Sequence, residues 1–342
     1  MKNQFVAALL GALVATPIFA SNWQALPAAA PAPADNPTTA AKVELGKMLY
    51  MDPRLSSTGT VSCNSCHNIM EGGDDSRPNS MGVNGQTGGR SAPTVWNAAF
   101  YSVQFWDGRA NLLEDQAKGP ITNPIEMGMK DHGQAMAVVK TIPGYAPYFD
   151  KAFGKDSINI VNAAKAIAAF ERTLITPNSA YDRFVKGDKK ALSAQQQKGM
   201  NKFAELGCAG CHSGAAFNGP EMEIGTGFFQ KFPTFADNGY VAKYKLSDDK
   251  GRGGVTDNAA DNNMFRVPTL RNITDTAPYF HNGAVATLDE AVRVMAKTQL
   301  NQDLSKQDVS DIVAFLGALT GEYPEITMPR LPASAGSTVI AE

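Results

Sequence analysis

The chain has 342 residues, of which 43% are hydrophobic and 19% are charged, and its formal net charge at pH 7 is −2. This composition is typical of a globular protein, and the length is enough for two domains. The near-neutral charge gives no reason to expect nucleic acid or an anionic membrane surface as a partner. Because only 8% of the residues are aromatic, cofactors have room to fill part of the core.

Residues 1–20 have the pattern of a secretory signal peptide. Lys2 gives a positive end, Phe5 to Phe19 is apolar, and Ala20 precedes a polar pair. An uncleaved anchor is the alternative, but the apolar run is short for a bilayer crossing, which takes roughly 20 residues. We therefore expect export, with no membrane span in the mature chain. Residues 21–40, rich in Ala and Pro, predict an extended lead-in.

All four cysteines lie in two copies of one motif, which reads Cys-Asn-Ser-Cys-His at residues 63–67 and Cys-Ala-Gly-Cys-His at residues 208–212. This is the attachment signature of a c-type haem. The thiols bond to the two vinyl-derived carbons of one porphyrin edge, and the imidazole binds the iron. Zinc sites and redox dithiols also use Cys-x-x-Cys, but they would leave both histidines without a role. The sequence thus predicts six haem-binding residues: Cys63, Cys66, His67, Cys208, Cys211 and His212.

Apolar spacing in the first half predicts a helix at 41–50, ended by an Asp-Pro pair, and a clearer helix at 158–174. Residues 71–93 are dominated by Gly, Asn, Ser, Asp and Pro, which indicates a long loop over the haem. We expect two helical pieces between them, at 96–110 and 112–118, separated by an Asp-Gly turn.

The second half begins in the same way as the first. Ser193 and Gln196 have the form of a capping box for the helix that leads to the second motif, and Thr287 begins a second such box. Ser305 opens the last helix, which we expect Gly321 to end. Residues 213–262 have little periodicity and predict no element.

The order helix, haem motif, long loop and late helix therefore occurs twice. We predict a mainly α protein with two cytochrome c-like domains, at residues 41–180 and 190–330, each around a covalently bound haem. No second His follows the first motif up to residue 127, and we expect no Met in this stretch to ligate the iron. The upper face of the first iron is therefore expected to be open, and an open iron can bind a substrate.

Six further segments are more specific than the haem motifs. They are Ala92-Pro93-Thr94, Asn97-Ala98-Ala99-Phe100, Phe105-Trp106-Asp107-Gly108-Arg109-Ala110, Asn123-Pro124-Ile125-Glu126-Met127, Val267-Pro268-Thr269-Leu270-Arg271-Asn272 and Ala277-Pro278-Tyr279-Phe280-His281. In these segments the chain resembles the bacterial dihaem cytochrome c peroxidase family, and the resemblance covers nearly the whole mature chain.

The resemblance implies a peroxidatic first haem and a second haem that accepts electrons at high potential. Met295 would be the second axial ligand of the second haem iron. Trp106 would lie between the haems, and His281 would lie near the second haem at the domain interface. Met295 also sits on a predicted late helix, and a thioether ligand stabilises ferrous iron. Met264 and Met222 are the competing ligands, because any single Met is more often a core residue.

By the same resemblance, Glu126 and Gln116 would line the peroxide pocket. A carboxylate can take a proton from the bound oxygen and return it to the leaving oxygen, and Gln116 can orient peroxide without titrating. The alternative for Glu126 is a surface carboxylate after a Pro turn.

The resemblance further implies a calcium ion between the domains, bound by the carbonyls of Thr276 and Pro278. Ser91 stands where the family commonly has an Asn ligand. Many members also have a His after Ser-x-Gly that caps the resting peroxidatic iron, and this chain has Val83 there. Because valine cannot coordinate iron, we expect an open first haem at rest, unless Met81 in the same loop replaces the missing ligand.

The leading hypothesis is a periplasmic enzyme that reduces hydrogen peroxide to water. Its electrons would come from a small periplasmic donor, a monohaem cytochrome c or a copper protein, and family members are often homodimers. The first alternative is a dihaem electron carrier without enzyme activity. The second is a protein-oxidising relative, in which a Tyr replaces the axial Met.

Overall fold

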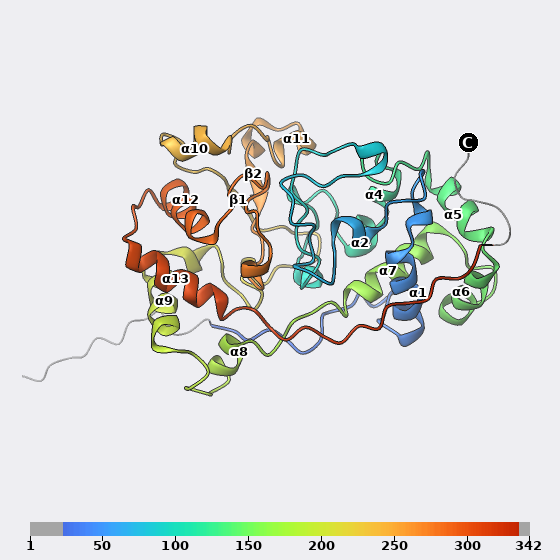
Figure 1. Ribbon diagram of the computed structural model, residues 1–342, viewed down its shortest axis with the longest axis horizontal. Helices are drawn as coiled ribbons and strands as arrows, with labels where there is room; N and C mark the ends of the chain where they lie inside the picture. Colours follow the sequence, from blue (N-terminus) through green and yellow to red (C-terminus); the bar gives the residue numbers. More distant parts are fainter. Residues whose placement is uncertain (1–22, 335–342) are drawn as a thin grey trace, which may run out of the picture.

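The computed structural model describes residues 23–334, so the predicted signal peptide lies outside the described residues. Figure 1 shows two lobes side by side, both mainly helical, which confirms the predicted fold class. In the described part, the named strands are β1 (Phe229–Lys231) and β2 (Met264–Arg266), which pair antiparallel. Across residues 23–334, every helix is too short or too polar to span a membrane.

The N-terminal lobe is built on a pair of crossing helices, α1 and α7. A Cβ on Gly46 of α1 would collide with the carbonyl of Ala166 on α7, so the two backbones are in direct contact. The helices of this lobe are α1 (Ala40–Met51), α2 (Cys63–Cys66), α3 (Leu113–Gln116), α4 (Gly119–Thr122), α5 (His132–Lys140), α6 (Ala146–Phe153) and α7 (Ile160–Glu171). The predicted helices at 41–50 and 158–174 are confirmed as α1 and α7.

The C-terminal lobe has an equivalent pair of helices in backbone contact, α9 and α13, where Gly199 lies against the carbonyl of Asp311. The Ser193 capping box is present, and the side chains of Thr287 and Ser305 cap the two last helices. The last helix ends at Gly317, before the predicted Gly321. The helices of this lobe are α8 (Ala180–Val185), α9 (Ala194–Glu205), α10 (Gly239–Tyr244), α11 (Gly253–Thr256), α12 (Leu288–Leu300) and α13 (Lys306–Gly317).

The prediction of a helical piece at 96–110 is wrong. This segment has a single 3₁₀ turn, Ala98–Phe100, followed by a hairpin in which Gln104 pairs with Ala110. Phe105 and Gly108 at the hairpin tip both have φ 68°, a left-handed conformation that cannot continue a right-handed helix. The Asp-Gly turn was placed correctly, but it closes a hairpin.

The same hairpin recurs in the second lobe, where Tyr279 pairs with Val285 and Phe280 has φ 72°. Upstream of each hairpin an Asn is left-handed: Asn97 has φ 64° and Asn272 has φ 58°. The matching residues are equally spaced along the chain, so both lobes are copies of one backbone design.

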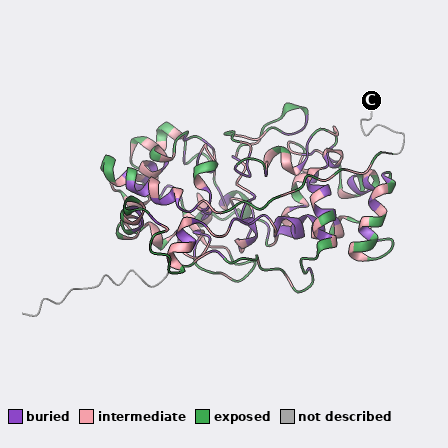
Figure 2. Ribbon diagram, turned by 60° about the horizontal axis from the view of Figure 1, so that its bottom comes forward, coloured by how far each residue is buried: buried purple, intermediate pink, exposed green. Residues whose placement is uncertain are grey.

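Both described ends of the chain cross from one lobe to the other. The lead-in begins with Trp23 in the C-terminal core and reaches the N-terminal lobe, where Asn36 donates to Glu114 at 2.6 Å. The tail after α13 runs back, and the carbonyl of Pro332 accepts from Arg54 at 2.9 Å. Figure 2 shows buried residues inside both lobes and exposed residues on their outer helix faces. The two crossing segments hold the lobes together, and the residue limits of the two domains stay a prediction.

Candidate functional site

The first haem motif lies on the short helix α2, capped by Ser62 in a capping box with Ser65. His67 ends this helix, and its Nδ1 donates to the carbonyl of Pro93 at 2.9 Å. This bond fixes the ring and leaves Nε2 with a lone pair for iron. Burial lowers the pKa of His67, which keeps the imidazole in its neutral, ligating form.

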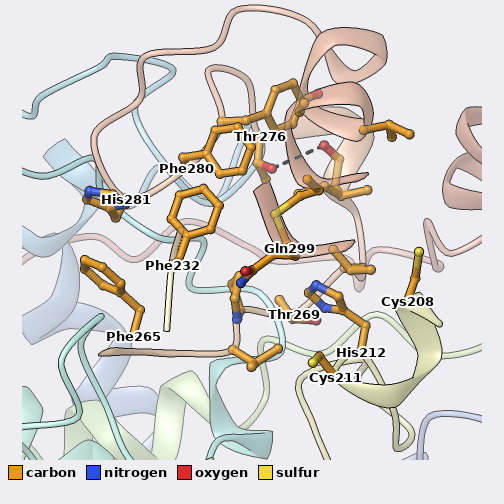
Figure 3. Close-up of a pocket in the computed structure, with 18 of the residues that line it drawn as sticks. Cys208, Cys211, His212, Phe232, Phe265, Thr269, Thr276, Phe280, His281 and Gln299 are labelled. Atoms are coloured by element: carbon orange, nitrogen blue, oxygen red, sulfur yellow. Dashed lines mark hydrogen bonds between the residues drawn. The ribbon is translucent and has the colours of Figure 1, made fainter. Parts of the chain in front are cut away.

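The second motif is held in the same way, because His212 Nδ1 donates to the carbonyl of Phe217 at 3.1 Å. Burial also lowers the pKa of His212. Cys208, Cys211 and His212 line one mainly apolar cavity, and Met295 of α12 lines it too. Figure 3 shows the motif on one side of this cavity and His281 on the other. Two thiols, an imidazole and a thioether around one apolar space fit a c-type haem with His and Met ligands.

All four thiols are unbridged and available for thioether bonds. Burial raises the pKa of Cys66 and of Cys208, each to about 11. The negative charge of Glu126 also raises the pKa of both Cys63 and Cys66. The predicted catalytic carboxylate is therefore close enough to the first haem motif to act on its thiols electrostatically.

Glu126 lies in a loop whose backbone packs against the Gly-rich loop, residues 71–93. Burial raises the pKa of Glu126, while the Arg109 guanidinium favours its charged form and opposes this shift. The backbone N–H of Val83 donates to the Glu126 carbonyl at 2.9 Å. A Cβ on Gly82 would collide with the carbonyls of Ile125 and Glu126. The half-buried carboxyl is thus fixed through its backbone, and the surface-carboxylate alternative is disfavoured.

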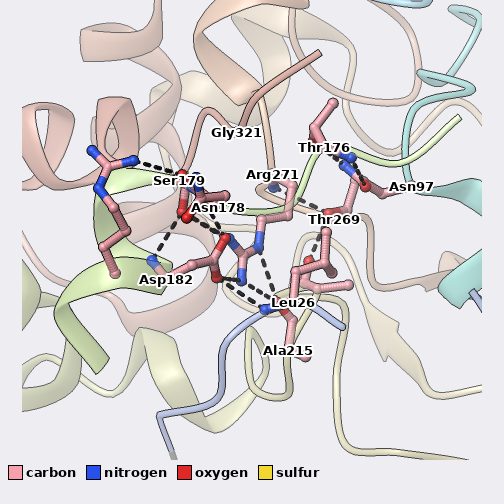
Figure 4. A network of polar contacts seen from close by, with 12 residues as sticks. Leu26, Asn97, Thr176, Asn178, Ser179, Asp182, Ala215, Thr269, Arg271 and Gly321 are labelled. Atoms are coloured by element: carbon pink, nitrogen blue, oxygen red, sulfur yellow. Dashed lines mark hydrogen bonds and ion pairs between the residues drawn. The ribbon is translucent and has the colours of Figure 1, made fainter. Parts of the chain in front are cut away.

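A buried ion pair holds the loop that follows the second motif (Figure 4). Arg271 Nη2 lies 2.8 Å from Asp182 Oδ1, with both side chains fully buried. The same guanidinium donates to the carbonyl of Ala215 at 2.6 and 2.9 Å. Thr269 Oγ1 donates to the next carbonyl, Ala216, at 2.6 Å. These bonds position the loop whose Phe217 carbonyl holds the ligand histidine.

Several known proteins are similar to this chain along most of its length. The sequence profile described as "Di-haem cytochrome c peroxidase" matches residues 40–190. Cytochrome c551 peroxidase of Nitrosomonas europaea is 46% identical over 308 residues, which cover 90% of this chain and 88% of that protein. Cytochrome c551 peroxidase of Pseudomonas aeruginosa is 45% identical over 300 residues, covering 86% and 83%. The chain belongs to the di-haem cytochrome c peroxidase family. Two haem c groups are therefore its cofactors.

A solved structure agrees with this assignment. The crystal structure of a MauG-like protein associated with microbial copper homeostasis has a TM-score of 0.77 at 28% identity, covering 87% of this chain and 95% of that chain.

In this di-haem family member, Trp106 lies at the junction of the lobes. Its Nε1 donates to the carbonyl of Ser91 at 2.9 Å, and its ring is edge-on to His281, with centroids 6.5 Å apart. Trp106 and His281 both line the second haem cavity. Gln116 ends α3 and is half-buried, and within residues 23–334 no hydrogen bond joins it to Glu126.

The predicted calcium residues also line this cavity, Ser91 from the N-terminal lobe and Thr276 and Pro278 from the C-terminal lobe. Asp74 lines it with them, is buried, and has a carboxylate oxygen, Oδ1, without a hydrogen-bond partner in the described part. Carbonyl and carboxylate oxygens are the donors that calcium takes, so this oxygen set fits the ion. The sequence analysis gave no role to Asp74 or to Arg109, which directly follow Gly73 and Gly108.

We expect Gly82→Ala to lower the free energy of unfolding by about 1–3 kcal/mol, because the new methyl group forces the Glu126 loop to shift. Gly89→Ala is the matched control, since a Cβ there meets open space. Chemical denaturation of the haem-loaded variants measures both. Equal stability of the two variants would contradict the close packing of the loops.

Arg271→Ala should lower the free energy of unfolding by about 3–5 kcal/mol, because Asp182 becomes a buried charge without a partner. Lys202→Ala is the control, since its pair with Glu205 is largely exposed and such pairs contribute about 1 kcal/mol or less. The same denaturation experiment compares them. A loss below about 1 kcal/mol for Arg271→Ala would show that the network is dispensable.

Proposed function

We propose that this protein reduces hydrogen peroxide to water at the first haem, with electrons received at the second haem from a small periplasmic donor. The difference between the two sites carries this proposal. His212 and Met295 share the second cavity, whereas the half-buried Glu126 lies in a segment bonded to the Gly-rich loop that follows the first motif. A site with two protein ligands suits electron transfer, and a site with a carboxyl group suits proton transfer.

One hydrogen peroxide, two protons and two electrons give two water molecules. The haems, when bound, would pass on the donor's electrons and supply the iron that binds peroxide. Glu126 would accept a proton from peroxide and return it to the leaving oxygen. A carboxyl whose pKa is raised towards neutrality does both steps better than an ordinary one. Gln116 then orients the peroxide through its amide.

Trp106 is the proposed relay between the two haems. Its contacts with Ser91 and His281 support this role, because they join a residue of each lobe. The donor is proposed to be a monohaem cytochrome c or a copper protein, in line with the cytochrome c551 peroxidase names of the relatives. Calcium between the lobes and a homodimer remain proposals.

The two alternatives are less well supported. An electron carrier has no use for a half-buried carboxyl beside its first haem motif. The protein-oxidising relative implied by the resemblance has a Tyr as the axial ligand, whereas here the proposed ligand is Met295, which lines the cavity.

Glu126→Gln should keep both haems and lower peroxide turnover by a factor of about 10² to 10⁴, the usual contribution of general acid-base catalysis. Because the pKa of Glu126 is raised above its ordinary 4.5 and the base form is needed, the wild-type rate should rise with pH through a limb above pH 4.5. That limb should be absent in the variant. Stopped-flow kinetics measures both, with Glu44→Gln, an exposed carboxylate of α1, as control. Wild-type rates in Glu126→Gln would make it a surface carboxylate.

Met295→Ala and Met295→His should lower the midpoint potential of the second haem and slow turnover with the donor, because the ligand that favours ferrous iron is lost. A redox titration followed by absorption spectroscopy measures the potential. Met264→Leu, at a competing methionine, is the control. An unchanged high-potential wave in the Met295 variants would mean that another residue is the ligand.

The oxidised resting enzyme should have a five-coordinate or water-bound first haem and should turn over without prior reduction. Val83 is buried in the N-terminal core and cannot coordinate, and Met81 has 48% of its surface exposed while its backbone pairs with Thr87. Electron paramagnetic resonance should show a high-spin ferric signal. Two low-spin haems together with a lag before activity would instead indicate a loop rearrangement that brings Met81 to the iron.

A further inference from the structure

Arg266 is a buried cation between two cavities. It is the last residue of β2, with 3% of its surface exposed. It lines the second haem cavity, and it also lines a second cavity enclosed by the lead-in, residues 99–104 and residues 214–228. Arg266 therefore lies between the second haem cavity and this neighbouring space.

Within residues 23–334 the guanidinium has only neutral partners. Its Nε donates to the carbonyl of Phe105 at 3.0 Å, Nη1 lies 3.4 Å from the carbonyl of Val267, and Cζ lies 3.4 Å above the ring of Tyr101. The carboxylates that line the cavities, Asp74 in the first and the exposed Glu221 in the second, form no ion pair with it.

The other two buried arginines in the described part each have a carboxylate. Arg172 lies 2.6 Å from Glu114, and Arg271 lies 2.8 Å from Asp182. A buried charge without a counter-ion costs several kcal/mol. Arg266 therefore needs an anion that the polypeptide itself does not supply.

We propose that Arg266 is the counter-ion of a propionate group of the second haem, and that it is a positioning residue that raises the potential of that haem. A haem carries its two propionates on the edge away from the carbons that bond to cysteine. The guanidinium of Arg266 stacks on Tyr101, which lines the same cavity as Cys208 and Cys211. A cation without a counter-ion therefore borders the space that the second haem would fill.

Arg266 is also bonded to the hairpin that carries Trp106, the proposed electron relay. Its backbone N–H donates to the Trp106 carbonyl at 2.8 Å, while its side chain holds the carbonyl of Phe105, the left-handed residue at the hairpin tip. One residue thus fixes the haem edge and the hairpin that carries Trp106. The inference depends on the second haem and is independent of peroxide chemistry.

The test is a spectroelectrochemical titration of the haem-loaded protein without peroxide. Arg266→Gln should shift the midpoint potential of the second haem downward and leave that of the first haem unchanged, because the propionate charge is no longer compensated and favours ferric iron. Arg266→Lys keeps the positive charge and should restore most of the shift. Arg252→Gln is the matched control, since Arg252 also stacks on a ring, Phe229, and donates to a carbonyl but lines neither cavity.

An unchanged second potential in Arg266→Gln would overturn the proposal. A free anion in the neighbouring cavity is the competing partner, and a wild-type potential that moves with added acetate would overturn the propionate assignment in its favour. If Arg266→Gln is isolated without its second haem, the haem content and the midpoint potential of Arg266→Lys distinguish a charge pair from a packing role. Retained haem at near the wild-type potential supports the charge pair, whereas loss of the haem from this variant as well would assign Arg266 a packing role only.

Discussion

The constraint on which the rest of the structure depends is that each ligand histidine must present Nε2 in one fixed direction. A backbone carbonyl does this in both lobes, Pro93 for His67 and Phe217 for His212. A carbonyl is fixed only if its own loop is fixed, so further bonds are needed around each one. The buried Thr176 bonds to Asn97 at 2.9 Å and to Asn272 at 3.1 Å. One threonine therefore joins Asn97, on the segment that follows Pro93, to Asn272, next to the Arg271 that holds the loop of Phe217.

The two copies of the backbone design have different side chains. The difference agrees with the proposed roles, peroxide reduction at the first haem and electron acceptance at the second. In the first hairpin the buried Asp107 pairs with Arg90 and Arg109, and Arg109 opposes the rise in the pKa of Glu126. The matching positions of the second hairpin are the uncharged Asn282 and Ala284. A cation that acts on the carboxyl of Glu126 is thus present in the first hairpin, and the matching position of the second hairpin carries no charge.

The sequence was sufficient where the information is local. Haem motifs depend on residues four positions apart, and the caps of α9 and α13 depend on residues three apart. The hairpin at 104–110 was missed because its tip places Phe105 in a left-handed conformation, which is rare for an aromatic residue. Asp74 and Arg266 were also missed, since what defines them is the lack of a charged partner in the folded chain. Such an absence is visible only when distant segments have been brought together.

The hairpin at residues 104–110 lies at the junction of the lobes and affects both the second haem cavity and the carboxyl of Glu126. Trp106 lines the second haem cavity, and three residues later the guanidinium of Arg109 acts on the carboxyl of Glu126. Arg266 bonds to the backbone of this hairpin, and Arg90 joins its Asp107 to Asp249 of the other lobe. A displacement of either lobe therefore moves the proposed electron relay and the proposed proton-transfer group together. The lead-in and the tail, which cross between the lobes, oppose such a displacement, and this explains why two otherwise similar domains are connected at both ends.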